Sequence, residues 1–337
     1  MATSNKSFPF EIRDIDPEQV EKLKKYFSKT TPPSTSRFGP KGYLLPRKFE
    51  HVGREIYNME IRPSDTFVVT FPRSGTTWTQ ELVWLILNNF DYEKALETPL
   101  AVRYIFLEFE TFMNNNDMAD MPIDEKLRKT VEENKLQVHK ILSIASPRFI
   151  KSHLPLSLLP QKLLDTCKIF YVARDPRDVV VSFYHQHILM KELLDGVDFK
   201  TFWELFINDL IAPTPLFEHV KEAWQMRNHP NMLFLFYEEL SKDLPACVRR
   251  VAKFLGKEIT QEQIEKLCEH LKFDNFKKNK SVNLDNMKGT GLWNEKESFI
   301  RKGKVGGWRD YFDEKMTEQA QRWIDENLRD TDLRFPH

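Results

Sequence analysis

The segment Thr66–Trp78 constrains the fold of this chain more than any other. An apolar run of strand length, Thr66–Phe71, leads directly into Pro72–Thr77, and a helical pattern follows from Thr77 to Asn88. A strand, a tight loop and a helix N-terminus in this order form an anion site. The unpaired N–H groups of the first helical turn point at the ligand, and the helix dipole favours negative charge. The segment therefore predicts that an anion binds at the start of this helix.

The loop carries side chains that suit a phosphate or a sulfate. Gly75 allows the backbone to wrap an oxyanion, Thr76 and Thr77 add hydroxyl donors, and Arg73 adds a charge-assisted fork. The spacing is not the Walker pattern GxxxxGK[ST]. Trp78 would either stack on a nucleobase or pack into the core. A plain strand-to-helix turn with capping hydroxyls is the alternative for the loop as a whole.

Three further apolar runs have the length of strands: Arg148–Lys151, Lys168–Ala173 and Met232–Phe236. Near-continuous apolar runs are typical of strands buried on both faces of a parallel sheet. Strand-helix alternation indicates an α/β fold. We therefore expect a single domain with a central parallel sheet flanked by helices and a P-loop-like nucleotide-binding architecture. The helical patterns between and after these runs are Pro176–Met190, Phe199–Asp209, Leu216–Arg227, Pro245–Leu255 and Gln261–Leu271.

Two segments lie outside this alternation. Residues 1–40 are polar, with one short helical pattern near Pro17–Phe27, and are interpreted as an N-terminal arm before a domain at 41–337. Residues 109–146 combine three methionines with a charged helical stretch and are interpreted as an insertion. The insertion is either a solvated surface helix or a lid over an apolar pocket, since methionines adapt to irregular apolar shapes.

The composition bounds the class of protein. Lys+Arg and Asp+Glu both number 50, so the formal net charge is zero, which argues against a broad nucleic-acid surface. Three cysteines without metal-ligand spacing suggest a reducing compartment. We find no signal peptide, no lipidation motif and no apolar stretch that approaches the roughly 18 residues of a membrane helix. We therefore expect a cytoplasmic protein with neither nucleic-acid nor membrane partners.

Basic residues recur after another strand and near the C-terminus. Arg174 follows the run Lys168–Ala173, so it should lie at the same edge of the sheet as the first loop. Ser182, two turns along the next helix, could share a phosphate with Arg174, although surface ion pairing within Arg174–Asp178 is the alternative. Phe299–Trp308 holds three basic residues among glycines and forms a second candidate anion cradle. Together with the first loop, it implies a ligand with phosphate at two separated ends.

Lys151 and His153 end the second apolar run. At positions i and i+2 of an extended stretch, the two side chains point the same way. A histidine has a pKa suited to general-base catalysis near neutral pH, although a lone histidine is more often structural. Its place at the end of a strand beside a phosphate loop favours catalysis.

In this order, the motifs resemble those of the cytosolic sulfotransferase family over nearly the whole chain, from about Phe38 to Arg334. The chain looks closest to an insect branch that includes a retinol dehydratase. The motifs that carry the family resemblance are Phe71–Trp78, Lys151–Pro155, Val172–Asp178 with Ser182, and Arg301–Gly303 with Trp308. The closeness to the insect branch rests on Thr79–Ile86, Asn231–Glu238 and Trp308–Glu314.

The resemblance implies the co-substrate 3′-phosphoadenosine 5′-phosphosulfate, the product 3′-phosphoadenosine 5′-phosphate, and a small apolar hydroxyl or amine acceptor, as in detoxification. No metal is expected. His153 would be the general base, and Lys151 would steady the sulfuryl group. Both would contact the acceptor, and Arg73 and Ser182 would assist catalysis. The donor contacts implied are Arg73, Ser74, Gly75, Thr76 and Thr77 at the 5′ end, Trp78 and Phe273 around adenine, and Arg174, Ser182, Arg301, Lys302 and Gly303 at the 3′-phosphate.

The chain departs from the family pattern in three places. Arg73 stands where the family usually has lysine, so contact with the bridging oxygen is expected to differ. A tyrosine that commonly meets the adenine is expected to be replaced, near Pro213. Asp313 and Glu314 depart from the family's dimer motif within Arg309–Glu318, which leaves a homodimer open but doubtful by that route.

Four functions compete on these residues. The first is sulfation of a small acceptor, and the second is dehydration of an alcohol with the same donor. A tryptophan at position 78 favours sulfation. A nucleotide-binding module without catalysis is disfavoured by the presence of both Lys151 and His153. A P-loop kinase is disfavoured because the Walker lysine spacing and an obvious magnesium carboxylate are lacking.

Overall fold

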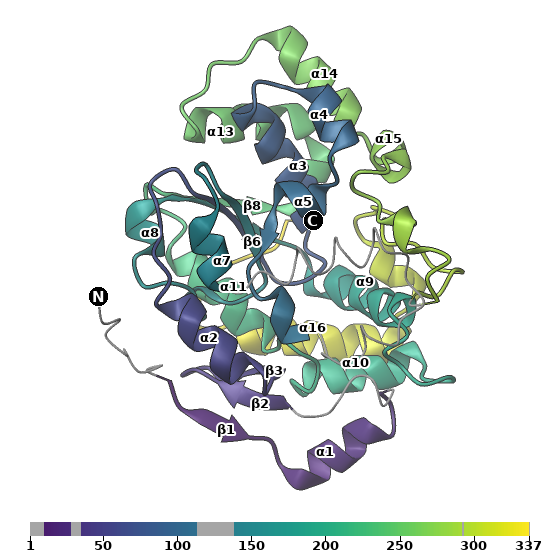
Figure 1. Cartoon of the computed structure of the whole chain (residues 1–337). Helices are drawn as coiled ribbons and strands as arrows, with labels where there is room; N and C mark the ends of the chain where they lie inside the picture. Colours follow the sequence, from purple (N-terminus) through teal and green to yellow (C-terminus); the bar gives the residue numbers. More distant parts are fainter. Residues whose placement is uncertain (1–9, 28–34, 113–137, 292, 337) are drawn as a thin grey trace.

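The computed structural model describes residues 10–27, 35–112, 138–291 and 293–336. Its centre is a five-stranded parallel sheet with the strand order β5-β6-β4-β7-β8 (Figure 1). The predicted strands and the expected α/β single-domain class are confirmed; the short β5 was not predicted. The strands are β4 (Thr66–Thr70), β5 (Ile105–Phe106), β6 (Phe149–Ser152), β7 (Lys168–Ala173) and β8 (Met232–Phe236).

The central strands are apolar throughout because both faces of the sheet are covered. In β4, Phe67 and Val69 contribute to one apolar core, and Val68 between them contributes to the other. In β7, Tyr171 and Val172 divide between the two cores in the same way. This follows from the two-residue period of a strand, whose successive side chains point to opposite faces. The sheet therefore lies in the middle layer of the domain.

Helices cover the two faces of the sheet as separate groups. Figure 1 shows α3, α13 and α14 on one side of the sheet and α2, α10 and α16 on the other. The first group is α3 (Thr76–Leu87), α4 (Tyr92–Glu97), α5 (Leu100–Arg103), α12 (Tyr237–Lys242), α13 (Leu244–Phe254), α14 (Gln261–Leu271) and α15 (Phe273–Lys278). The second is α2 (Phe49–Tyr57), α7 (Val138–Ser143), α8 (Leu163–Thr166), α9 (Pro176–Leu189), α10 (Phe199–Ile207), α11 (Leu216–Gln225) and α16 (Glu314–Leu328).

The sequence explains where the helices α9 and α16 begin. Asp175 caps α9 by accepting a hydrogen bond from the Arg177 amide at 2.9 Å, and Pro176 occupies the first turn. Asp313 caps α16 in the same way, through the Met316 amide at 2.7 Å. The acidic residue that departs from the family's dimer motif therefore has a structural role of its own. The remaining short 3-10 turns are η1 (Phe109–Phe112), η2 (Leu156–Leu158), η3 (Asp285–Met287) and η4 (Gly307–Asp310).

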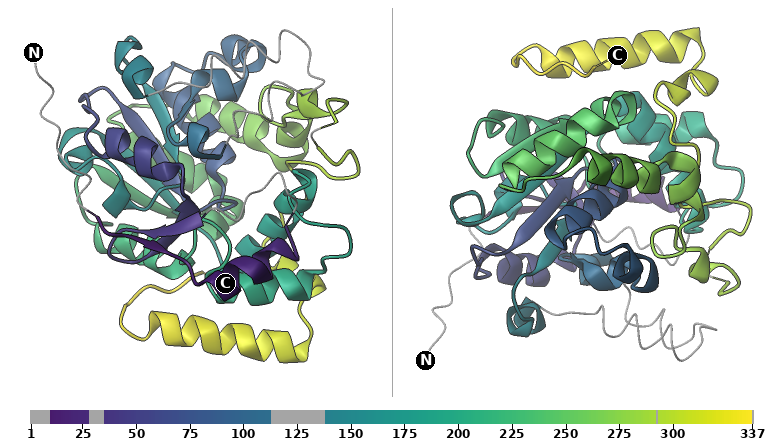
Figure 2. Two further views of the ribbon diagram at one scale, coloured as in Figure 1. Left: turned by 60° about the horizontal axis from the view of Figure 1, so that its bottom comes forward. Right: turned by 90° about the horizontal axis from the view of Figure 1, so that it is seen from above.

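The described part of the N-terminal arm packs onto the domain. Figure 2 shows its strands and the helix α1 along one side of the molecule, in purple. Ile15, Leu23 and Phe38 are buried in the same core as the helices of the second group. The elements of the arm are β1 (Ile12–Asp14), α1 (Pro17–Lys24) and β2 (Thr35–Phe38). Its two strands form a three-stranded antiparallel sheet with β3 (Tyr43–Pro46).

The central part of the expected insertion, residues 113–137, lies outside the described residues. The prediction of a lid at 109–146 therefore stays a prediction, and only its ends, η1 and α7, belong to the structure described above. Among the residues that the structure covers, no helix combines the length and the apolar character needed to cross a bilayer.

Candidate active site

The loop between β4 and α3 is shaped by a glycine in a left-handed conformation. Gly75 has a φ of +106°, and a Cβ atom at this position would lie 2.8 Å from Cδ2 of Tyr237. A side chain there would meet both backbone strain and a steric clash, so the tight approach of the loop to Tyr237 requires glycine. The hydroxyls of Thr70 and Thr76 lie 2.6 Å apart and join the end of β4 to the first turn of α3.

Arg73 is fixed across the loop by two other segments of the chain. Its Nε atom donates to the Ser182 hydroxyl on α9 at 3.0 Å, and Nη2 donates to the Phe299 carbonyl at 2.9 Å. Burial, together with the positive charges of Arg174 and Arg301, lowers the pKa of Arg73 to about 10, so it remains charged at neutral pH. A cluster of mutually repelling arginines is stabilised when an anion binds among them.

Arg174, directly after β7, closes the other side of the loop. Its guanidinium donates to the carbonyls of Arg73 and Lys304, both at 3.2 Å, and lies 4.2 Å from the centre of the Tyr237 ring. Its Nε atom is buried without a hydrogen-bond partner. A buried donor of this kind costs free energy unless something accepts from it, and a bound phosphate would do so.

The basic segment near the C-terminus folds back onto these elements. Gly303 has a φ of +61°, and a Cβ atom there would lie 2.3 Å from the Phe273 ring. Tyr237 donates its hydroxyl to the Gly303 carbonyl at 3.1 Å. Asp178 of α9 accepts hydrogen bonds from the amides of Gly306 at 2.6 Å and Trp308 at 2.9 Å. The segment is thereby fixed against α9.

Aromatic rings line the same region. Trp78 is oriented by a hydrogen bond of 2.9 Å from its indole nitrogen to the Leu271 carbonyl, and its ring centre lies 5.6 Å from that of Tyr237. Phe273 begins the short helix α15 and contacts Gly303. The structure therefore brings the predicted Trp78 and Phe273 to the phosphate loop Pro72–Thr77 and to the basic segment Phe299–Trp308.

Tyr237 is the residue of this region that the sequence reading missed. We expected a site tyrosine to be lost near Pro213, yet Tyr237 contacts Gly75, Arg174 and Gly303. That expectation is corrected: a tyrosine is present, and it enters from the end of β8. Its position directly after a predicted strand, at the carboxyl edge of the sheet, was the signal that could have identified it.

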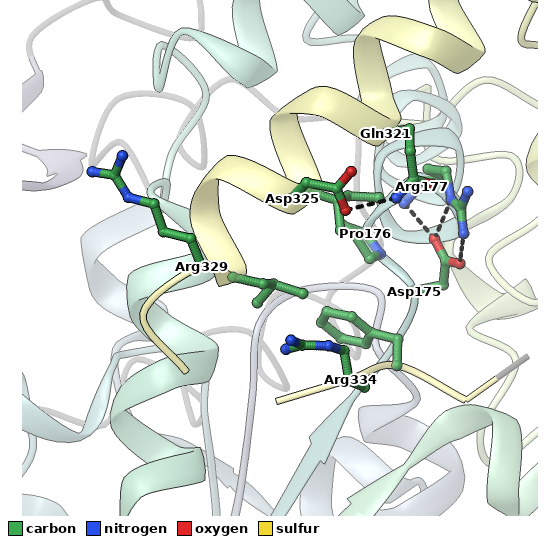
Figure 3. A pocket seen from close by; sticks show the side chains of 10 residues that line it. Asp175, Pro176, Arg177, Gln321, Asp325, Arg329 and Arg334 are labelled. Atoms are coloured by element: carbon green, nitrogen blue, oxygen red, sulfur yellow. Dashed lines mark hydrogen bonds and ion pairs between the residues drawn. The ribbon is translucent and has the colours of Figure 1, made fainter. Parts of the chain in front are cut away.

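Arg177, in contrast, is not directed at the phosphate loop. It forms a bidentate ion pair with Asp175, with distances of 3.0 and 2.6 Å, and its guanidinium lies 4.2 Å from the Trp308 ring. It lines a separate cavity between the start of α9, the helix α16 and the C-terminal segment with Arg334 (Figure 3). The volume of this cavity is about 290 Å³. Within Arg174–Asp178, Arg177 thus forms an ion pair that is buried rather than at the surface, whereas Arg174 contacts the Arg73 carbonyl in the loop.

Lys151 and His153 lie at the end of β6, next to β4. In the register of the sheet, Lys151 is the partner of Phe106 in β5, and its Nζ atom lies 4.1 Å from the Phe106 ring centre. His153 meets the same ring edge-on at 5.5 Å. Burial lowers the pKa of Lys151 to about 8, and the neighbouring Glu108 carboxylate opposes that shift.

The tautomer of His153 follows from its partners. Nδ1 lies 2.9 Å from the Thr70 carbonyl, which can only accept a hydrogen bond, so Nδ1 carries the proton and Nε2 has a free lone pair. Burial, reinforced by the charge of Lys151, lowers the pKa of His153 to about 3. The imidazole is therefore neutral at physiological pH and can accept a proton at Nε2. Thr70 joins this histidine to Thr76 of the phosphate loop.

Glu108, which follows β5, was not anticipated from the sequence. Its fully buried carboxylate accepts hydrogen bonds from the His153 amide at 2.5 Å and the Ser152 hydroxyl at 2.8 Å. Burial raises its pKa to about 7, against the opposing effect of these hydrogen bonds and of Lys151. An acidic residue in a mixed loop gives no sequence signal, because only the pairing of β5 with β6 brings it to the end of β6.

The described residues contain no group of three or more histidine, cysteine, aspartate or glutamate side chains arranged to hold a metal ion. Arg73, Arg174, Arg301 and Lys151 place positive charge at the site. The arrangement provides fixed positive charge at an anion cradle, with a neutral imidazole and a buried lysine beside it.

Comparison with known proteins connects this geometry to a family. Residues 63–332 match the sulfotransferase domain family. The chain belongs to this family. It is 31% identical over 310 residues to sulfotransferase 1E1 of Bos taurus, which covers 91% of this chain and 98% of that protein. It is 36% identical over 284 residues to the luciferin sulfotransferase of Photinus pyralis, which covers 81% of this chain and 74% of that protein.

Solved structures of retinol dehydratase share more of the sequence. The structure in complex with retinol and PAP is 47% identical, has a TM-score of 0.92, and covers 98% of this chain and 100% of that chain. A second structure, with androsterone and the inactive cofactor PAP, is 46% identical and also has a TM-score of 0.92, with 98% and 99% covered. The resemblance inferred from the sequence is confirmed, and the chain is a sulfotransferase enzyme.

Proposed function

We propose that this sulfotransferase uses 3′-phosphoadenosine 5′-phosphosulfate as donor and sulfates a hydroxyl or amine of a small apolar acceptor. The observation that carries the proposal is the connection through Thr70. The Thr70 hydroxyl contacts the Thr76 hydroxyl in the anion cradle, the loop Pro72–Thr77 with the basic residues around it. The hydroxyl and the carbonyl of Thr70 both contact Nδ1 of His153. The presence of PAP in the solved retinol dehydratase structures supports the choice of nucleotide.

The residues of the cradle fit such a donor at both of its ends. Arg73–Thr77 would hold the 5′ end, with the loop N–H groups and the threonine hydroxyls as donors. Arg174 and Ser182, with Arg301–Gly303, would hold the 3′-phosphate, which would satisfy the unpaired Nε of Arg174. Trp78 and Phe273 would flank the adenine. When bound, the donor supplies an activated sulfuryl group attached to a phosphate leaving group.

On the acceptor side, Nε2 of His153 would take the proton from the attacking hydroxyl. The hydrogen bond from Nδ1 to the Thr70 carbonyl holds the imidazole in the required tautomer. Lys151 would place positive charge beside the transferring group. Sulfuryl transfer, like phosphoryl transfer, depends on positioning and charge neutralisation more than on covalent help, and both side chains are held for that purpose.

The rings near His153 favour an apolar acceptor. Phe106 contacts both Lys151 and His153, and its ring centre lies 5.8 Å from that of Phe109 and 6.2 Å from that of Phe112. Such a group of aromatic side chains offers a large apolar contact area with defined geometry. We therefore propose a phenol or an apolar alcohol as the acceptor class.

The test is a transfer assay with the purified protein and donor labelled in the sulfuryl group. A panel of phenols, apolar alcohols and amines is expected to yield labelled products together with stoichiometric 3′-phosphoadenosine 5′-phosphate. Tighter binding of a nucleoside triphosphate than of 3′-phosphoadenosine 5′-phosphate would contradict the donor. Tight nucleotide binding without transfer to any acceptor would instead indicate a non-catalytic binding module.

Dehydration of an alcohol is the second candidate. It is favoured by the 47% identity to retinol dehydratase over nearly the whole chain. With retinol as acceptor, mass spectrometry separates the two outcomes: a product heavier by one sulfuryl group supports sulfation, and a product lighter by one water supports dehydration.

A further inference from the structure

Arg301 is held by a hydrogen-bonded chain that begins on a different element. Its Nη1 atom donates to the Tyr311 hydroxyl at 3.1 Å. That hydroxyl lies 2.6 Å from Nε2 of His185 on α9, and Nδ1 of His185 lies 3.1 Å from the Glu297 carboxylate. These hydrogen bonds therefore connect His185 of α9, Glu297 in the loop before the basic segment, and Tyr311 directly after η4.

The outer hydrogen bonds have a fixed direction, because a guanidinium can only donate and a carboxylate can only accept. Arg301 therefore donates to the Tyr311 hydroxyl, and Nδ1 of His185 donates to Glu297. Burial and the charge of Arg301 lower the pKa of His185, which favours a neutral imidazole whose proton is on Nδ1. In this form Nε2 accepts, so the Tyr311 hydroxyl donates to it.

Other contacts fix the backbone near Arg301, and Tyr311 holds the orientation of its side chain. Lys277 donates to the Arg301 carbonyl at 3.2 Å, and Tyr237 donates to the Gly303 carbonyl at 3.1 Å. In the part of the chain that the structure describes, the Arg301 guanidinium donates its hydrogen bond to Tyr311. The Tyr311 ring is itself held edge-on by Phe199 at 5.3 Å.

We propose that Tyr311, held by His185 and Glu297, is a positioning residue that aims the Arg301 guanidinium at the 3′-phosphate of the donor. This rests on the proposed function, in which Arg301 contacts that phosphate. An aimed guanidinium loses less freedom when the nucleotide binds, so removal of the hydroxyl weakens nucleotide binding without any change at Lys151 or His153.

The test is a double-mutant cycle on nucleotide affinity, measured by calorimetry. Tyr311→Phe keeps the ring and removes the hydroxyl, and it is expected to weaken binding of 3′-phosphoadenosine 5′-phosphate by roughly threefold to tenfold. In an Arg301→Ala background, the same substitution is expected to have no further effect, because there is no guanidinium left to aim. Adenosine 5′-monophosphate, which lacks the 3′-phosphate, should bind the wild type and Tyr311→Phe equally.

Tyr184→Phe is the matched control. It removes a tyrosine hydroxyl on the residue next to His185. That hydroxyl donates to the Val197 carbonyl at 3.0 Å and is not part of the hydrogen-bonded series from Arg301 to Glu297. Its nucleotide affinity should equal that of the wild type. Unchanged affinity in Tyr311→Phe, or an equal loss in the wild-type and Arg301→Ala backgrounds, would overturn the positioning role alone. Unchanged affinity in Arg301→Ala would overturn the proposed role of Arg301 at the phosphate, and the positioning role with it.

Discussion

The donor side and the acceptor side of the site are built in different ways. On the donor side, Gly75 and Gly303 lie at left-handed backbone positions, and Arg73 and Arg174 are fixed by hydrogen bonds to backbone carbonyls. On the acceptor side, Lys151 and His153 contact the aromatic ring of Phe106. The donor side therefore depends on backbone shape and fixed charge, and the acceptor side on side-chain packing and protonation.

This difference predicts that the two sides fail separately. A change on the acceptor side should reduce transfer and spare nucleotide affinity, whereas a change in the cradle should reduce nucleotide affinity first. The buried Thr70 joins the two sides. Substitutions on either side therefore test whether nucleotide affinity and transfer can be lost separately.

The largest effect is expected from His153→Ala. Loss of the general base should lower kcat by about 10²–10⁴-fold, while affinity for 3′-phosphoadenosine 5′-phosphate stays close to that of the wild type. Steady-state kinetics and calorimetry on the same preparation measure the two quantities. A kcat within a few-fold of the wild type would contradict the role of His153 as base.

Gly303→Ala should have the next largest effect, on the donor side. The new Cβ atom would lie 2.3 Å from the Phe273 ring, so that ring must move. We expect nucleotide affinity to fall about 10- to 100-fold, in line with the roughly 1–3 kcal/mol of strain at such positions. Gly256→Ala is the control, because Gly256 has a similar φ of +65° and open space around it. Equal affinities in the two variants would show that Gly303 does not shape the cradle.

Much of the site could be predicted from the sequence, because its residues follow strands in a fixed order. Parallel strands place Thr70, His153 and Arg174 at one edge of the sheet, and a glycine after a strand predicts a tight loop. Tyr237 could have been found in the same way, because it directly follows a predicted strand. Glu108 was missed for a physical reason, since its role depends on the pairing of β5 with β6, and no single segment of the sequence specifies the strand order β5-β6-β4-β7-β8. The same holds for the hydrogen-bonded chain from Arg301 to Glu297.

Glu108→Gln should change the pH dependence on the acceptor side. In the wild type, kcat/KM should fall as the pH drops through about 7, because protonated Glu108 no longer offsets the charge of Lys151, and that charge makes His153 a weaker base. The pKa of about 3 for His153 lies too low to cause this decline. The variant should lose the decline, with a decrease in kcat of about tenfold.

Glu110→Gln is the matched control for that experiment, since Glu110 pairs with Lys48 at 3.7 Å rather than with the end of β6. Its pH profile should match that of the wild type. A decline near pH 7 that persists in Glu108→Gln would assign the titration to another group.

The smallest effect is expected from Arg73→Lys. Lysine keeps the charge but cannot reach both the Ser182 hydroxyl and the Phe299 carbonyl with a planar fork. We expect nucleotide affinity to fall by about threefold and kcat to stay within about fivefold of the wild type. A loss beyond a hundredfold in either quantity would show that the arginine has a role that lysine cannot take.

The most direct test follows the acceptor oxygen through the reaction. An alcohol labelled with heavy oxygen in its hydroxyl is incubated with 3′-phosphoadenosine 5′-phosphosulfate and the enzyme, and the products are resolved by mass spectrometry. We predict a sulfate ester that keeps the heavy oxygen between carbon and sulfur, with one 3′-phosphoadenosine 5′-phosphate per ester. Heavy oxygen released in free sulfate would instead indicate dehydration through a sulfated alcohol. No consumption of the donor with any acceptor of the proposed class would contradict sulfuryl transfer by this site.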